Sequence, residues 1–125
     1  MAMSYDEILY DIDGPVATIT MNRPDQLNAL TDLTQAEIRH ALDQSERNPN
    51  VVGTVLTGSG RGFCAGVDMN ALSDMSEAGE RQGRSHDHLS ANPGNPDDDP
   101  HYKSSPTYFL GLRKPLIAAI NGAAA

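Results

Sequence analysis

The sequence has one cysteine, no tryptophan and no long apolar run. A lone cysteine, Cys64, cannot form an intrachain disulfide, which fits the reducing environment of the cytoplasm. A transmembrane helix needs roughly 20 consecutive apolar residues, and no segment approaches that length. The N-terminal stretch is acidic and lacks the apolar segment of a signal peptide. We therefore expect a cytoplasmic protein with no membrane segment.

Basic residues are also scarce. The chain carries 9 Lys and Arg against 17 Asp and Glu, which gives a formal net charge of −8 at pH 7. Nucleic acids and anionic membranes attract basic surfaces, so neither is an expected partner. The 125 residues, of which 38% are apolar, suffice for one domain with one hydrophobic core.

Local patterns predict strands and helices of an α/β protein. Apolar and polar residues alternate over Tyr5–Asp11 and Val16–Met21, which predicts two strands joined by a turn at Asp13-Gly14-Pro15. Near the end of the chain, Pro106–Leu112 is typical of a short helix that starts with proline. The apolar run Leu116–Ile120 predicts a buried strand.

Between these strands the apolar period becomes helical. The helix is expected to begin near Thr31 and to end near Asn48-Pro49-Asn50, because proline and asparagine are typical of helix ends. The sequence Thr34-Gln35-Ala36-Glu37 fits a capping box, so we expect the first turn of the helix there.

The segment Val51–Asp68, VVGTVLTGSGRGFCAGVD, carries the most informative pattern. Its start predicts a buried strand, its end has four glycines in nine residues, and Asp68 opens a weak helical stretch to Leu72. A strand, a glycine loop and a helix start together aim free backbone N–H groups at an atom that carries or develops negative charge. The glycine spacing fits neither a dinucleotide-binding loop nor a P-loop, and a purely structural turn is the alternative.

Residues 73–105 differ from the rest of the chain. They hold three prolines, several Gly and Ser, and the acidic run Asp97-Asp98-Asp99. A structureless stretch of this length inside a compact domain is usually functional or disordered, so we expect a mobile loop. The sequence stops at Ala125, just after a buried strand and the turn Asn121-Gly122. Because domains normally end in exposed polar linkers, we expect residues 1–125 to be the N-terminal part of a larger domain.

Three motifs follow one another along the chain: Val16–Pro24 with Leu27-Asn28-Ala29-Leu30, then Gly60–Asp68, then Lys114–Gly122. In order and spacing they resemble the opening, the first oxyanion-hole segment and the strand before the second oxyanion-hole segment of the enoyl-CoA hydratase/isomerase (crotonase) superfamily. The resemblance covers essentially the whole chain. It implies the N-terminal part of a crotonase-like ββα spiral, an acyl-CoA thioester substrate, and assembly as homotrimers or hexamers.

The resemblance also implies site residues. The family stabilises a thioester enolate with two backbone N–H groups, which suit an oxygen whose charge grows in the transition state. Matched to the motif, the Ala65 N–H is one of these donors, and Ala65 lies among the residues that bind CoA. Six further positions match places where the family lines the pocket or contacts CoA: Gln26, Leu27, Ala29, Gly66, Val67 and Asp68. For the first three, a plain turn into a helix is the alternative.

The activity that the resemblance implies is that of an enoyl-CoA hydratase, which adds water across a trans-2-enoyl-CoA. An enoyl-CoA isomerase, another crotonase-type acyl-CoA enzyme and a non-catalytic truncated fragment are the alternatives. CoA is part of the substrate, and we expect no other cofactor. The family's second N–H donor, a glycine just past the Asn-Gly turn, and its two acid–base glutamates have no counterpart within the chain. One missing oxyanion donor costs about 10²–10³ in rate and each acid–base group about 10²–10⁴, so we expect residues 1–125 alone to be inactive.

Three other features offer weaker hypotheses. Cys64 has no histidine nearby to activate it, so a small buried cysteine is favoured over a nucleophile. His86 and His88 with His101 could hold a metal, but histidines on an acidic loop are more often solvated, and we expect no metal site. Arg61 is either a contact to a CoA phosphate or a solvated loop residue.

Overall fold

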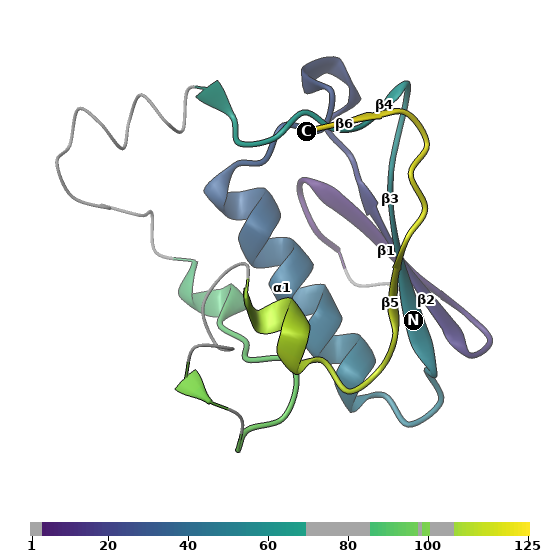
Figure 1. Cartoon of the computed structure of the whole chain (residues 1–125), viewed down its shortest axis with the longest axis vertical. Coiled ribbons are helices and arrows are strands. Elements are labelled where there is room, and N and C mark those ends of the chain that lie inside the picture. The colour runs from purple at the N-terminus through teal and green to yellow at the C-terminus, as the bar shows by residue number, and fades with distance from the viewer. Residues whose placement is uncertain (1–3, 70–85, 98, 101–106) are drawn as a thin grey trace, which may run out of the picture.

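The computed structural model describes residues 4–69, 86–97, 99–100 and 107–125. Its main sheet consists, in spatial order, of β1 (Ile8–Asp13), β2 (Val16–Met21), β3 (Gly53–Gly58) and β5 (Leu116–Ala118). One long helix, α1 (Asp32–Arg47), lies against this sheet (Figure 1). Two short strands pair in a second sheet, β4 (Gly62–Cys64) and β6 (Ala123–Ala124). The expected α/β class is confirmed.

The β1–β2 hairpin forms because every second one of its six residue pairs places apolar side chains on the same face. The strands are antiparallel, from Ile8 opposite Met21 to Asp13 opposite Val16. The prediction for β2 is confirmed residue for residue, whereas β1 starts and ends later than expected. Before Ile8, the N–H groups of Asp6 and Glu7 donate to the carboxylate of Glu37 instead of a partner strand, which explains the later start.

The helix α1 begins one turn before the predicted capping box. Thr31 is the N-cap: its side chain accepts the Thr34 N–H at 3.0 Å, and the Thr34 hydroxyl accepts the Thr31 N–H at 3.4 Å. Threonine therefore takes the place that Glu or Gln usually holds in this motif. The expected box starting at Thr34 is wrong because Glu37, its last residue, is committed to the entry of β1. The predicted end of the helix, near Asn48, is confirmed.

The hydrophobic core lies between α1 and the main sheet. Its most buried apolar side chains alternate along the strands and recur at helical spacing on α1: Ile8, Tyr10, Ala17, Ile19, Met21, Ile38, Ala41 and Leu42. The chain returns through α1 so that β3 lies parallel to β2, and β5 extends the sheet parallel to β3. The strand predicted from Val51 starts at Gly53. Just before it, the Val52 N–H donates to the carbonyl of Pro15, the residue that precedes β2.

Short 3₁₀ helices complete the described structure. They are η1 (Pro24–Gln26), η2 (Asp87–Leu89) and η4 (Thr107–Gly111). The helix expected near Pro106 is present as a 3₁₀ turn. The strand expected to reach Ile120 ends at Ala118, and its expected burial is wrong, because Ile117 is 60% and Ile120 64% exposed. Arg39 of α1 contacts residues near both η2 and η4. Its Nε donates to the carbonyl of Ala91 at 2.9 Å, and its guanidinium carbon lies 4.8 Å from the ring centroid of Tyr108.

Two predictions fall mainly outside the described residues. Residues 70–72 of the helical stretch predicted for Asp68–Leu72 are not described, and most of the expected mobile loop 73–105 lies in residues 73–85, 98 and 101–105, which are not described either. Among the described helices, none is long and apolar enough to cross a membrane.

Candidate functional site

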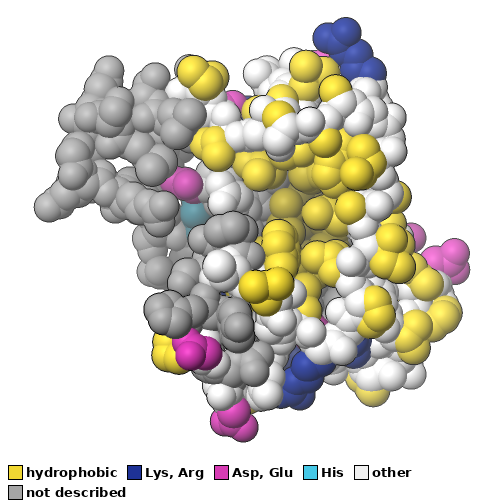
Figure 2. All heavy atoms as spheres, viewed as in Figure 1, with side chains coloured by type: hydrophobic (Ala, Val, Ile, Leu, Met, Phe, Trp, Pro, Cys, Tyr) yellow, Lys and Arg dark blue, Asp and Glu magenta, His cyan; other side chains and the backbone are white. Residues whose placement is uncertain are grey.

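An open cavity of about 390 Å³ lies where β4 meets β6. Its lining residues are Leu27, Arg61, Gly62, Cys64, Ala65, Ala123, Ala124 and Ala125. Small-molecule sites have volumes of about 300–1,000 Å³ and mostly apolar walls, and this cavity meets both conditions. Figure 2 shows hydrophobic side chains gathered around a hollow on the face that carries α1 and β5. The cavity is therefore suited to an apolar group of a small molecule.

The glycine-rich loop turns back so tightly that glycine is required at its start. A Cβ at Gly58 would lie 2.6 Å from the carbonyl oxygen of Phe63 and 2.8 Å from that of Gly62. Further on, Gly66 has φ +92°, which L side chains rarely adopt. The sequence pattern thus has a direct structural cause at these two positions.

The segment after η1 runs alongside the end of the glycine loop. The Ala65 N–H donates to the carbonyl of Leu27 at 3.0 Å, and the Leu30 N–H donates to the carbonyl of Gly66 at 2.7 Å. The Asp68 N–H donates back to Leu30 at 2.8 Å, so that Leu30 and Val67 form a parallel bridge. Two motifs far apart in the sequence, residues 27–30 and 65–68, are therefore side by side.

This pairing corrects one expectation. The Ala65 N–H is engaged by Leu27 and is not a free donor in the cavity wall. Gly66 and Val67 are different, because neither N–H donates to any residue that the structure describes. In an extended segment, successive N–H groups point to opposite sides. Since the Asp68 N–H faces Leu30, the Val67 N–H faces away from residues 27–30.

The other predicted site residues divide into two groups. Leu27 and Ala65 line the cavity, whereas Gln26, Ala29, Gly66, Val67 and Asp68 do not. Asp68 is 7% exposed, and its carboxylate is 3.2 Å from the Arg23 guanidinium, which neutralises it. Arg23 also lies 3.5 Å from the carboxylate of Glu7. The carboxylate of Asp68 therefore fastens the end of the glycine loop to the turn after β2.

The weaker hypotheses can be placed as well. Cys64 is a free thiol, 8% exposed, which packs against the core and also contributes to the cavity wall. His86 and His88 stack edge to face with ring centroids 6.4 Å apart, and His101 lies outside the described residues. No group of three or more metal-ligating side chains occurs in the described part of the chain. Arg61 is exposed at the cavity and forms no ion pair with a described residue.

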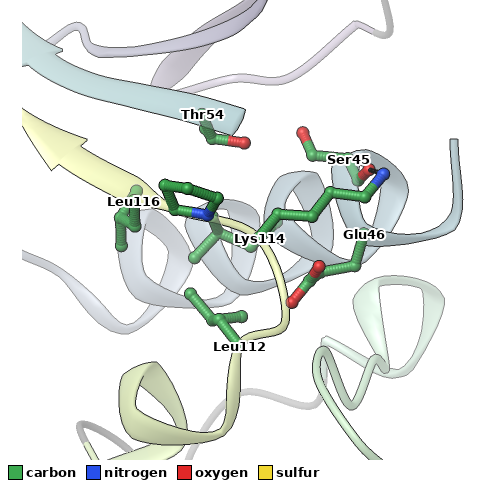
Figure 3. A pocket seen from close by; sticks show the side chains of 8 residues that line it. Ser45, Glu46, Thr54, Leu112, Lys114 and Leu116 are labelled. Atoms are coloured by element: carbon green, nitrogen blue, oxygen red, sulfur yellow. Dashed lines mark hydrogen bonds between the residues drawn. The ribbon is translucent and has the colours of Figure 1, made fainter. Parts of the chain in front are cut away.

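A second, much smaller cavity lies between the C-terminal end of α1 and the start of β5. Figure 3 shows Lys114 extending across it toward Ser45. The ammonium donates to the carbonyls of Ser45 and Asn48 at 2.8 and 2.6 Å, and so satisfies the last turn of α1. The cavity volume of about 10 Å³ is room for about one water molecule. This cavity is a small gap between packed side chains and is too small to bind a substrate.

Comparison with solved structures identifies the class of fold. The chain superposes on an enoyl-CoA hydratase/isomerase from Mycobacterium paratuberculosis with a TM-score of 0.64 and 34% identity, which covers 95% of this chain and 39% of that one. The architecture is that of the crotonase fold. The sequence also matches the profile of the enoyl-CoA hydratase/isomerase family over residues 11–125. The chain belongs to this family.

Curated relatives carry different activities. A short-chain enoyl-CoA hydratase from Clostridium acetobutylicum is 35% identical over 121 residues, which is 96% of this chain and 41% of the relative. A 1,2-epoxyphenylacetyl-CoA isomerase from Escherichia coli K12 is 34% identical over 119 residues, which is 94% of this chain and 41% of the relative. The chain thus spans about two fifths of the length of each relative.

Proposed function

We propose that the protein is an enoyl-CoA hydratase that adds water across the double bond of a trans-2-enoyl-CoA. The observation that carries the proposal is the glycine loop beside the cavity, which leaves the N–H groups of Gly66 and Val67 without an acceptor among the described residues. Addition of water to an enoyl thioester passes through an enolate, whose oxygen gains negative charge. Fixed backbone donors stabilise such an oxygen without reorganising.

The donor in this proposal is the Val67 N–H, since the Ala65 N–H is already bonded to Leu27. Ala65 instead contributes to the cavity wall, and Gln26, Leu27, Ala29, Gly66 and Asp68 remain proposed neighbours of CoA. The acyl chain would occupy the apolar cavity. CoA enters as part of the substrate, and the proposal needs no further cofactor.

Acid–base catalysis is assigned to groups outside the described part of this chain. No carboxylate lines the cavity there, and Glu7, Glu37 and Glu46 are engaged elsewhere. Glu7 accepts from the Thr31 hydroxyl, Glu37 from two N–H groups before β1, and Glu46 from the Arg113 N–H. Assembly as homotrimers or hexamers and a cytoplasmic location remain predictions. Light scattering on the purified protein measures the first.

The activity is tested with the protein as its gene encodes it. A hydratase removes the conjugated absorbance of a trans-2-enoyl-CoA and yields a 3-hydroxyacyl-CoA that mass spectrometry detects. An enoyl-CoA isomerase, the alternative, instead converts a 3-enoyl-CoA into the conjugated isomer and creates that absorbance. Binding without turnover of either substrate would support a non-catalytic role, and absence of binding would refute an acyl-CoA function.

A further inference from the structure

Two consecutive residues ahead of α1 adopt a backbone conformation that side chains disfavour. Leu27 has φ 50° and Asn28 has φ 57°, both in the left-handed region. For residues other than glycine this conformation is uncommon, although asparagine accepts it better than most. Such strain persists only where surrounding contacts fix it, and it concentrates at functional sites. The contacts of Leu27 and Asn28 show which segment this strained turn fixes.

Asn28 holds the glycine loop. Its side chain is 1% exposed, and its Nδ2 donates to the carbonyls of Ser59 at 3.0 Å and Gly62 at 2.9 Å. Its Oδ1 accepts the Arg23 N–H at 2.8 Å. Both amide hydrogens and the amide oxygen are thus used, which fixes the orientation of the amide.

Asn121, nearly a hundred residues further on, repeats this pattern from the other side. Its Nδ2 donates to the carbonyls of Gly60 at 3.1 Å and Gly62 at 3.2 Å, and its Oδ1 accepts the Gly58 N–H at 3.2 Å. The carbonyl oxygen of Gly62 therefore accepts one bond from each asparagine. A carbonyl oxygen has two lone pairs, so the two amides together satisfy it.

The two ends of β4 are consequently fixed by the same pair of left-handed residues. Asn28 holds the carbonyl of Gly62 at the start of β4, and Leu27 accepts the Ala65 N–H just after its end. Gly66 and Val67 come next in the chain after Ala65, and their N–H groups donate to no residue that the structure describes.

We infer that Asn28 and Asn121 are positioning residues, which clamp the carbonyl of Gly62 and thereby aim the Val67 N–H at the substrate oxygen. The inference rests on the proposed function for its catalytic consequence. Its structural part, the clamp itself, stands independently of the substrate. Neither side chain touches the reacting atoms, so both act through the loop.

The test uses Asn28→Asp and Asn121→Asp in the protein as its gene encodes it. Each substitution keeps the size of the side chain and an oxygen acceptor but removes both donors. A complete oxyanion donor accounts for about 10²–10³ in rate, and a displaced donor is expected to cost at least about tenfold in kcat. Substrate KM should change less than kcat, because ground-state binding depends mainly on the cavity and CoA contacts. The matched control is Asn92→Asp, at an exposed asparagine whose side chain accepts a bond from Arg39, and it should leave kcat unchanged.

A second readout needs no substrate. Hydrogen exchange at the Ala65 N–H should accelerate in both variants, because its bond to Leu27 depends on the position of β4. Exchange at Ile19, in the middle of β2, should stay the same, whereas a general loss of stability would accelerate both amides.

Asn121 is exposed, so its variant remains informative if the Asn28 variant does not fold. Because the two share one acceptor, the double variant should lose less kcat than the product of the single losses.

The outcomes separate the inference from the proposed function. If the wild type hydrates an enoyl-CoA and both variants keep its kcat and its Ala65 exchange rate, the clamp has no positioning role and the inference is overturned. A fall in kcat with unchanged Ala65 exchange would also overturn it. If the wild type turns over no enoyl-CoA, the proposed function fails, and the exchange rates alone decide whether the clamp exists.

Discussion

Two regions of the molecule are held together by different forces. In the hairpin–helix region, formed by β1, β2 and α1, apolar side chains such as Ile8, Ile19 and Leu42 are at most 2% exposed. In the loop region, formed by residues 23–30, 58–68 and 121–125, the buried groups include Asn28 and Asp68, and hydrogen bonds and an ion pair join the segments. Apolar packing has little directionality, whereas hydrogen bonds fix angles and distances. The first region therefore supplies stability, and the second supplies geometry.

The sharpest test of this division removes one N–H from the loop region. Val67→Pro deletes the proposed donor, while the bonds of the Leu30–Val67 bridge use the N–H groups of Leu30 and Asp68. We expect kcat/KM for an enoyl-CoA to fall by about 10²–10³, or about 3–4 kcal/mol of transition-state stabilisation. Steady-state kinetics measures this, and thermal unfolding checks that the fold is kept. Val67→Ala retains the N–H and is the control. A proline variant with wild-type activity would exclude Val67 as the donor.

The converse change is made in the hairpin–helix region. Leu42 is 2% exposed between α1 and the main sheet, so Leu42→Ala removes buried methyl groups and leaves a cavity. We expect the free energy of unfolding to fall by about 3 kcal/mol, measured by urea denaturation. The kcat of the remaining folded protein should stay within about twofold of the wild type, as the comparison of the two regions requires. Val52→Ala, at a side chain that is 63% exposed, should change stability by less than about 0.5 kcal/mol.

Alkaline pH tests the packing of η4 on α1. Burial raises the pKa of Tyr108 to about 12, against a smaller lowering by the neighbouring Arg39 guanidinium. The folded state thus binds the phenol proton more tightly than the unfolded state, whose pKa is about 10. The resulting stabilisation is present below about pH 10 and is lost as the pH rises toward 12. Compared at about pH 9 and about pH 11.5, the wild type should lose of the order of 2 kcal/mol more than Tyr108→Phe. Equal losses would show that Tyr108 ionises freely in the folded state.

The sequence predicted the hairpin–helix region better than the loop region, and the reason is physical. The strand Val16–Met21 and the end of α1 follow from local periodicity and local stop signals. The choice of Ala65 as the free donor was wrong because the direction of its N–H depends on pairing with Leu27. Such a pairing joins segments far apart in the chain, and a local motif does not encode it.

The same limit applies to β6 and to the asparagine clamp. Two alanines, Ala123 and Ala124, have no strong strand preference, and they become a strand only by pairing with β4. Asn28 and Asn121 belong to the motifs that carry the family resemblance. Their shared acceptor, the carbonyl of Gly62, is seen only in the folded structure. By contrast, the glycines at 58 and 66 were readable from the sequence, since close backbone approach and positive φ are what glycine permits.

The smallest expected effect concerns the charge at the cavity. Arg61 is an exposed cation in a chain of net charge −8, at the wall of the cavity proposed to hold a CoA thioester. Arg61→Gln should weaken binding of acyl-CoA by a few-fold, since exposed ion pairs contribute about 0.2–1 kcal/mol. The difference should shrink at high salt and vanish for an acyl-pantetheine thioester, which lacks the phosphates. Calorimetry of both ligands measures this. Arg47→Gln, which removes an exposed cation at the end of α1, is the control for net charge. Equal loss of affinity for the pantetheine thioester would show that Arg61 shapes the cavity and does not contact a phosphate.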